Sequence, residues 1–494
     1  MITNPNERLI TESEYWAVLE EQNLMKSIFF IILHPKSLKI LNEMKKSIFL
    51  LMISIIMLSG CAGEQWKPVG EAVYSITDGV LTLKSGTLMY HGAGAAKGFT
   101  DFEMSGFAKT EPNTVAGIWF HSDPDRKGYE VVIHNGPQDN TRKTGSLAAV
   151  RNLYKSMAKD NEWFPFTITV RGKNIAIQIN DRDVVCYTEP DKPYRITANS
   201  KSVLGQGGFL LYSYQGKVDF KDISVKPLPA DAAPSVELPK AIDEQIDPII
   251  RLQQQNFPVI DYHVHLKGWT MEQAHALSMS YGINYGIAPN CGIGFPITDD
   301  AGVRSYVDST KNMPFYFGMQ GEGREWTTTF SAASRQLFDY VFTDALTFID
   351  HKGRRTRLWI PDETFIDIPV EKYMDLIVDR TVTVLQSEPI DIYVNPTLLP
   401  DQMQPDYDRL WTKERYEKVI KVLKDNNIAL EINARYKIPN FAIIRAAKAA
   451  GIKITFGTNN ATPDMGKLDY CLEAIKACGL TPNDLWFPVN RRGK

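Results

Sequence analysis

Apolar and polar residues alternate with a period of two over long parts of residues 66–228, the pattern of β-strands that bury one face. The clearest case is the run 166–170, which is followed by a polar turn at 171–174 and a second alternating run at 175–179. Helical periodicity is almost absent here. The alternation predicts further strands near residues 102–108, 116–121, 129–134, 208–214 and 218–225. Together these strands predict an antiparallel two-sheet β-sandwich or jelly roll.

Residues 257–494 follow a different pattern, in which short apolar runs alternate with helical stretches. The apolar runs predict strands at residues 259–265, 283–289, 315–321, 340–347, 391–395, 428–433 and 453–457. Helical periodicity between them is clearest at residues 415–425, 441–450 and 468–478. Strands that alternate with helices pair in parallel, so we expect an α/β barrel of seven strands that resembles a distorted TIM barrel.

A stretch rich in proline and alanine separates the two patterns. The linker is expected over residues 229–256, and its first part, up to about residue 239, has the composition of a stiff extended spacer. A short helix is expected at residues 242–255, leading into the second domain. The length of 494 residues also fits two domains, because one hydrophobic core rarely serves more than about 250–300 residues.

Residues 44–60 have the form of an export signal, with a basic start, an apolar core of about a dozen residues and small residues at the end. The ending 58–61, Leu-Ser-Gly-Cys, resembles the bacterial lipoprotein box, which implies cleavage before Cys61 and lipidation of its thiol. We therefore expect a lipid-anchored protein of the cell envelope, on the periplasmic or outer-membrane face. Residues 1–43 are interpreted as an over-extended start. The alternative is an N-terminal anchor that is never cut.

Composition restricts the partners. The formal net charge is -3 and no long basic stretch occurs, which argues against nucleic acid. The remaining cysteines lack metal-type spacing and are expected to be free buried thiols: Cys186, Cys291, Cys471 and Cys478.

The first candidate site is the pair His263 and His265 at the end of the first predicted barrel strand. Residues two apart share a strand face, so both imidazoles point the same way. At the C-terminal end of a barrel strand, that direction is the mouth where active sites form. Paired imidazoles are ready ligands for a divalent metal.

Several motifs of this half resemble the PHP family of metal-dependent phosphoesterases: His263-Val264-His265, Gly321-Glu322, Leu430-Glu431-Ile432-Asn433 and Gly457-Thr458-Asn459. The resemblance implies a distorted seven-stranded barrel that hydrolyses phosphoesters with bound metals. It places His263, His265 and Glu322 at ligand positions, with Asp344 as a possible fourth, around one divalent ion such as Mn, Zn or Co.

The departures from that family concern the remaining ligands. Asn290, Asn395 and Asn459 stand where the family has histidine or aspartate, and they are expected at the barrel mouth together with Glu431. Asparagine is a poor substitute for those ligands, so a full metal cluster is not expected. The alternative is a barrel without metal, whose histidines are simply hydrogen-bonded. His275 and His351 are expected at the surface.

The motifs of the first half resemble the 3-keto-disaccharide hydrolase family, also described as 3-keto-glucoside lyase/hydratase, a concanavalin-like jelly roll. They are residues 78–81, 99–103, 117–121, 128–131, 144–145 and 216–223. The resemblance implies action on glycosides already oxidised at C3. The ketone acidifies the C2 proton, so a base there and an electrophile at the ketone oxygen allow elimination of the glycosidic bond.

Carried over by position, Glu130 matches the family's glutamate after Gly-Tyr, and His121 stands where arginine is usual. His134 lies four residues after Glu130 on the same strand face, so the candidate catalytic residues are Glu130, His121 and His134. Other family positions are changed, which puts catalysis in doubt but keeps a sugar-binding cleft: Asn135, Ser213 and Gln215. Four aromatic residues either stack on sugar rings or fill the sandwich core: Trp119, Trp163, Tyr129 and Tyr212.

Three hypotheses follow for the function. The leading one is an exported lipoprotein hydrolase or lyase acting on oligosaccharides or other glycosides of the 3-keto type, joined to a PHP-like barrel. The second is a metal-dependent phosphoesterase whose chemistry lies in the barrel. The third is a non-catalytic glycan-binding lipoprotein, so the sequence leaves open whether the chain is an enzyme.

Overall fold

The computed structural model describes residues 65–229 and 240–488. The predictions that concern the start at 1–43, the export signal at 44–60 and lipidation of Cys61 lie outside the described residues. Within them, no helix combines the length and the apolar character needed to cross a membrane.

The first half is one continuous antiparallel sheet that folds over itself, with strand order β6-β5-β10-β3-β11-β4-β7-β8-β9. Strands β1 and β2 also pair with β3. The eleven strands are β1 (Trp66–Pro68), β2 (Val73–Thr77), β3 (Val80–Tyr90), β4 (Phe102–Thr110), β5 (Val115–Ser122), β6 (Tyr129–Ile133), β7 (Phe164–Arg171), β8 (Asn174–Ile179), β9 (Arg182–Thr188), β10 (Gly208–Gln215) and β11 (Val218–Pro227). A short 3-10 helix, η1 (Thr197–Asn199), precedes β10.

Strand β3 belongs to both layers of the fold. Its first part pairs with β11 and its last part with β10, and Gly86 lies between them with φ 93°. A Cβ at Gly86 would lie 2.4 Å from the Glu71 carbonyl oxygen, so only glycine fits this bend. The alternating strands bury one face each, as in the BiBiBiBi pattern of β7, and these faces form one core between the layers. The predicted jelly-roll-like antiparallel fold is confirmed.

The second half contains a closed parallel barrel. Its order is β12-β13-β15-β16-β19-β20-β21, and β21 pairs back with β12. The bounds are β12 (Ile260–Val264), β13 (Asn284–Ile287), β15 (Tyr316–Gly321), β16 (Tyr340–Thr343), β19 (Ile392–Tyr393), β20 (Ala429–Asn433) and β21 (Ile454–Gly457). A two-residue strand, β14 (Asn290–Cys291), adds to β15, and β17 (Thr347–Ile349) pairs with β18 (Arg355–Arg357). Each predicted barrel strand is present, so the seven-stranded barrel is confirmed.

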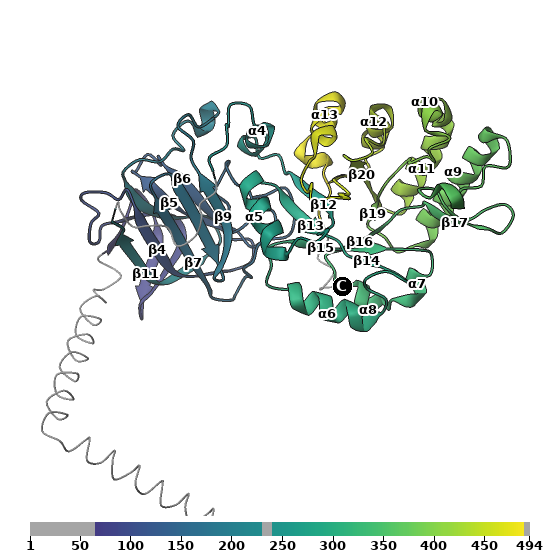
Figure 1. Cartoon of the computed structure of the whole chain (residues 1–494). Helices are drawn as coiled ribbons and strands as arrows, with labels where there is room; N and C mark the ends of the chain where they lie inside the picture. Colours follow the sequence, from purple (N-terminus) through teal and green to yellow (C-terminus); the bar gives the residue numbers. More distant parts are fainter. Residues whose placement is uncertain (1–64, 230–239, 489–494) are drawn as a thin grey trace, which may run out of the picture. The chain divides into compact units, whose positions relative to one another are not determined.

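Helices surround the barrel (Figure 1). They are α4 (Pro248–Gln254), α5 (Met271–Tyr281), α6 (Asp300–Thr310), α7 (Trp326–Thr329), α8 (Ala332–Arg335), α9 (Val370–Ser387), α10 (Tyr407–Leu410), α11 (Lys413–Asp425), α12 (Phe441–Ala449) and α13 (Asp469–Cys478), with 3-10 turns η2 (Pro361–Glu363), η3 (Gln404–Asp406) and η4 (Pro482–Asp484). Local signals set their ends, as at α5, where Thr270 forms a capping box with Gln273 and Gly282 ends the helix at φ 67°.

The segment before the barrel packs on the sandwich. Its helix begins at Pro248, capped by Asp247, and is shorter than the predicted 242–255. The fully buried Glu244 lies 2.7 Å from the Arg195 guanidinium and accepts a hydrogen bond from Tyr187. A buried ion pair with these additional hydrogen bonds satisfies both charges, so this segment is held to the sandwich. The extended spacer predicted up to about residue 239 falls mostly outside the described residues.

Candidate functional site

The outer face of the layer formed by β6, β5 and β10 carries the candidate site of the sandwich. Strand register places Trp119 opposite Glu130, and Gly117 opposite both Val132 and Tyr212. Because side chains alternate along a strand, these positions face away from the core that their neighbours fill.

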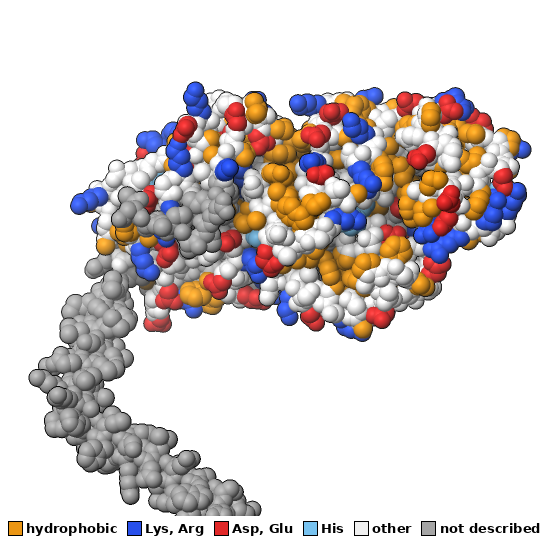
Figure 2. Space-filling model, in the orientation of Figure 1, with side chains coloured by type: hydrophobic (Ala, Val, Ile, Leu, Met, Phe, Trp, Pro, Cys, Tyr) orange, Lys and Arg blue, Asp and Glu red, His pale blue; other side chains and the backbone are white. Residues whose placement is uncertain are grey.

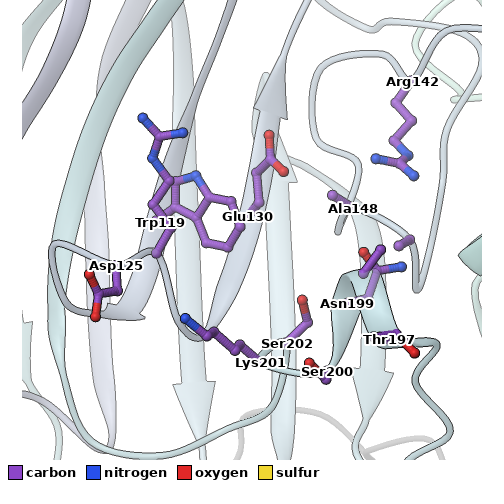
Figure 3. Close-up of a pocket in the computed structure, with 13 residues that line it drawn as sticks. Trp119, Asp125, Glu130, Arg142, Ala148, Thr197, Asn199, Ser200, Lys201 and Ser202 are labelled. Atoms are coloured by element: carbon purple, nitrogen blue, oxygen red, sulfur yellow. The ribbon is translucent and has the colours of Figure 1, made fainter.

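Two cavities lie on this face and share Glu130 and Arg142. The first has about 310 Å³ and is bounded by Trp119, Arg126 and the loop 197–202. In Figure 3, Glu130 and Trp119 come from adjacent strands, and Arg142 comes from a loop across the cavity. The second cavity has about 480 Å³ and is lined by other residues: His134, Asp139, Tyr212, Tyr214, Gln215 and Asn256 among them. We call the two together the Glu130 groove.

Glu130 is the acid of the groove whose pKa is raised. Burial raises the pKa of its carboxyl, while a hydrogen bond from Tyr212 and the charges of Arg142 and Arg126 lower it. The Tyr212 hydroxyl donates to Glu130 Oε1. Gly117 makes room for this pair, because a Cβ there would lie 2.6 Å from the Tyr212 hydroxyl. A carboxyl with a raised pKa, held by a neutral donor and facing a cavity, has the properties of a general base.

His134 lies in the groove as its spacing from Glu130 predicts. Its Nδ1–H donates to the Thr114 carbonyl at 2.8 Å, and the residue lines the second cavity. That tautomer presents Nε2 as an acceptor.

The structure does not bring His121 to the groove. The residue has φ 53° and stands beside an irregular register between β5 and β10, so strand alternation breaks there. Its Nε2–H donates to the Thr100 carbonyl at 2.8 Å, and its Nδ1 accepts from the Gly205 N–H at 3.2 Å. The ring packs edge-on against Phe102 and Phe120, and it lines neither cavity of the groove.

Of the four aromatic residues, two line the groove, one is in the core and one is covered by lysines. Trp119 and Tyr212 line the groove. Tyr129 is fully buried, where its hydroxyl bonds to Glu189, and Trp163 lies under the ammonium groups of Lys109 and Lys221.

Sequence reasoning missed the cationic side of the groove, formed by Arg126, Arg142 and Lys201. All three lie in loops, where no periodicity marks a residue's direction. Arg142 is placed by a loop that follows β6, because Val132 N–H donates to Ser146 O and Ala148 N–H to Glu130 O. The only sequence signal is that arginine and lysine flank the strand carrying the family-matched glutamate.

At the barrel mouth, six of the seven strands of the ring contribute polar residues at or just after their C-terminal ends. The predicted mouth residues come from six different strand ends: His263, His265, Glu322, Asp344, Asn395, Glu431 and Asn459, with Asn290 beside them on β14. The charge of His263 lowers the pKa of both Glu322 and Asp344. These three predicted ligands therefore face the same region.

His263 forms a buried dyad with Glu431. Its Nδ1–H donates to Glu431 Oε1 at 2.6 Å, and Nε2 is buried without a hydrogen-bond partner in the described residues. Burial lowers the pKa of His263, but Glu431, Asp261 and Gln320 together outweigh burial, so the pKa is raised. His265 differs, because burial lowers its pKa to about 3 and its Nδ1–H donates to the Ala288 carbonyl at 2.9 Å.

The carboxylates of the mouth are held by amides. Asn290 Nδ2 and Gln320 Nε2 donate to Glu322 Oε1 at 2.5 and 3.0 Å. Asn395 Nδ2 lies 3.3 Å from Asp344 Oδ2. Burial, then the facing Asp344 charge, raises the pKa of Glu322 to about 7, and burial raises that of Asp344.

The arrangement does not fit a metal centre. Nowhere in residues 65–229 and 240–488 do three His, Cys, Asp or Glu side chains lie close enough to hold one ion. Neutral amide N–H groups occupy carboxylate oxygens that a cation would need, and amides cannot replace them as charged ligands. In the part of the chain that the structure describes, His263 Nε2 and Gln320 Oε1 are buried atoms of the mouth without a hydrogen-bond partner.

One of the remaining histidines departs from prediction. His275 is not at the surface but 7 % exposed, and its Nε2–H donates to the Asp183 carbonyl at 2.6 Å, because α5 packs against β9. His351 is partly exposed and lies 3.1 Å from Asp367. The four cysteines after Cys61 are free, and Cys186 alone among them is only half-buried.

Comparison with known families gives one match. Residues 57–226 match the model of the 3-keto-alpha-glucoside-1,2-lyase-like domain. The N-terminal part of the predicted resemblance is therefore supported. A comparison with curated proteins finds no match.

The solved structures that are similar to the chain each cover about a third of it. Two crystal structures of proteins assigned as glycosyl hydrolases, both from Parabacteroides distasonis ATCC 8503, are 16 % and 20 % identical to the chain, with TM-scores of 0.30 and 0.27. They cover 34 % and 33 % of this chain, and 89 % and 99 % of their own. The carbohydrate binding module CBM66 from Bacillus subtilis is 14 % identical with a TM-score of 0.25, covering 33 % of this chain and 95 % of its own.

Proposed function

We propose that the Glu130 groove binds a glycoside already oxidised at C3 and cleaves its glycosidic bond by elimination, with Glu130 as the base. The observation that carries the proposal is a half-buried carboxyl with a raised pKa, held by Tyr212 and facing Arg142 across a cavity. The match of residues 57–226 to the 3-keto-alpha-glucoside-1,2-lyase-like domain supports the choice of substrate.

The chemistry assigns one task to each group. The Glu130 carboxylate takes the C2 proton, and the C2–H electrons form an enolate whose negative oxygen lies at C3. A guanidinium stabilises such an oxygen, and Arg142 has a buried Nε–H without a partner in the described residues. The enolate then expels the C1 oxygen, which takes the proton from Glu130. Addition of water across the C1–C2 double bond gives net hydrolysis.

The sugar ring needs a platform in this scheme. Trp119 lies beside Glu130 on the adjacent strand and lines the first cavity (Figure 3). An indole face is a suitable surface for the C–H groups of a pyranose. His134 lines the second cavity, where its Nε2 can accept a hydrogen bond from a hydroxyl of the leaving group or from the water that adds to C1.

The experiment that tests the proposal is cleavage of a 3-keto-glucoside and of the unoxidised glucoside. We expect turnover of the oxidised compound alone, and a loss of about 10²–10⁴-fold in kcat for Glu130→Gln. The matched control is Glu103→Gln, a partly exposed strand glutamate on β4 whose nearest cation is Lys226 at 3.8 Å. Binding without cleavage would instead favour the glycan-binding alternative.

We further propose that the protein works at the cell envelope, tethered through a lipid on Cys61. The support is the sequence of residues 44–61 alone. Cys61→Ala should move the protein from the membrane fraction to the soluble fraction of cells. Unchanged membrane association would contradict this localisation.

A further inference from the structure

The ionisable side chains that line the first cavity are three cations and two acids, so the cations exceed the acids by one. Arg126, Arg142 and Lys201 line it, against Asp125 and Glu130. On the face of the molecule drawn in Figure 2, by contrast, positive and negative side chains are interspersed. A local excess of positive charge attracts ligands of negative charge.

These cations are not taken up by carboxylates of the described chain. Arg126 donates to two neutral oxygens, the Tyr214 hydroxyl at 2.6 Å and Thr87 Oγ1 at 3.3 Å. No ion pair of Arg142 or Lys201 is present within residues 65–229 and 240–488. Nearby lysines outside the first cavity behave differently, since Lys127 pairs with Asp123 at 2.7 Å and Lys143 with Asp139 at 2.8 Å.

The cavity also holds buried donors that need an acceptor. Trp119 Nε1 and Arg142 Nε are buried and have no hydrogen-bond partner in the described residues. Both groups are donors only, so oxygen acceptors of a ligand in this cavity can pair with them. Buried donors without a partner are unfavourable, and a bound acceptor removes this cost.

The backbone around the cavity is held in an unusual conformation. Arg126 and Ala149 both line it and have φ 58° and 65°, in the left-handed region that non-glycine residues seldom adopt. Such residues concentrate at binding sites, where the surrounding structure holds them in place. Two loops that flank Glu130 thus bring their residues to the cavity in fixed positions.

We propose that the glycoside bound in the Glu130 groove is acidic, with an anionic group of the sugar held by Arg126 and Lys201. The inference rests on the proposed glycoside function. Arg142 keeps its proposed role of stabilising the oxygen at C3. A carboxylate is the anion that suits this set best, because it accepts without donating and its two oxygens match the planar guanidinium. The substrate class is therefore a uronic acid glycoside, with a sulfated sugar as the other source of the same charge.

The test is a comparison of binding by calorimetry, which needs no turnover. The probes are a methyl glucuronide, the methyl glucoside of the same anomeric form and its 6-sulfate. We expect the glucuronide to bind at least about tenfold more tightly than the glucoside at low salt, and this ratio to fall as salt is added. Tighter binding of the sulfate than of the glucuronide would identify a sulfated sugar as the ligand instead.

Two variants assign the preference to its residues. Lys201→Met and Arg126→Gln should each lower the ratio of glucuronide to glucoside affinity by about three- to tenfold. The matched control is Lys127→Met, which removes a lysine one residue after Arg126 that pairs with Asp123 and does not line the cavity. The control should keep the wild-type ratio.

The outcomes separate the inference from the proposed function. If glucuronide and glucoside bind equally while the 3-keto-glucoside is cleaved, the acidic substrate class is wrong and the function stands. If neither sugar binds and the 3-keto-glucoside is not cleaved, both are wrong. An equal loss of the ratio in Lys127→Met would show that long-range charge, not the groove, sets the preference.

Discussion

Single residues set the acid–base behaviour of the groove. The Tyr212 hydroxyl donates to Glu130 and lowers the pKa of that carboxyl, against the rise that burial causes. Tyr212→Phe removes the donor, so the pKa of Glu130 should rise further. The acid limb of the pH profile of kcat/KM should move up by about one pH unit.

The control for this change is Tyr74→Phe, an exposed tyrosine on β2. This change also removes one tyrosine hydroxyl from the sandwich, and it should leave the pH profile of kcat/KM unchanged. An acid limb that stays at the wild-type pH in Tyr212→Phe would mean that Glu130 is not the group whose ionisation the profile reports.

At the barrel mouth, Glu322 should make stability depend on pH. Its pKa is raised to about 7 from the usual 4.5. Between these values the unfolded carboxyl loses its proton while the folded one keeps it, so the free energy of unfolding falls as pH rises. The contribution of Glu322 to the free energy of unfolding is complete below pH 4.5. It falls by about 3 kcal/mol at most between pH 4.5 and pH 8.

Glu322→Gln should remove this slope, measured by urea denaturation at pH 5 and pH 8. Glu417→Gln, on the exposed side of α11, is the control and should keep the wild-type slope. Equal slopes in Glu322→Gln and the wild type would refute the raised pKa.

Among the elements, β5 shows how a strand places the site. Gly117 lets Tyr212 approach, since a Cβ would lie 2.5 Å from the Val131 carbonyl oxygen and 2.6 Å from the Tyr212 hydroxyl. Gly117→Ala should destabilise the fold by about 1–3 kcal/mol and displace Tyr212 from Glu130. Gly205→Ala, with nothing within 4 Å of the added carbon, should cost much less in thermal denaturation. Equal costs would contradict this packing.

The elements also show what a sequence can predict. The barrel strands and the face shared by Glu130 and His134 follow from periodicity, because side-chain direction in a regular strand depends only on spacing. His121 escapes this rule, since its positive φ and the irregular register turn the ring inward. The position of Arg142 in the groove could not be predicted from the sequence, because a loop residue has no periodic pattern that gives the direction of its side chain.

For the whole molecule, the two halves differ in how completely their sites are assembled. The sandwich offers a groove with an unpaired cationic side, whereas amides fill the barrel mouth. Purified protein should therefore carry well under one equivalent of Mn, Zn or Co by elemental analysis, and a chelator should leave its Tm unchanged. About one bound equivalent, lost in the His263→Ala, His265→Ala double variant, would support the phosphoesterase alternative.

The most direct measurement of the central claim is the rate of glycosidic cleavage of a 3-keto-glucoside by the wild-type chain, Glu130→Gln and Glu103→Gln. The account predicts turnover by the wild type and by Glu103→Gln, and a loss of about 10²–10⁴-fold in kcat for Glu130→Gln. Undiminished turnover by Glu130→Gln would contradict it.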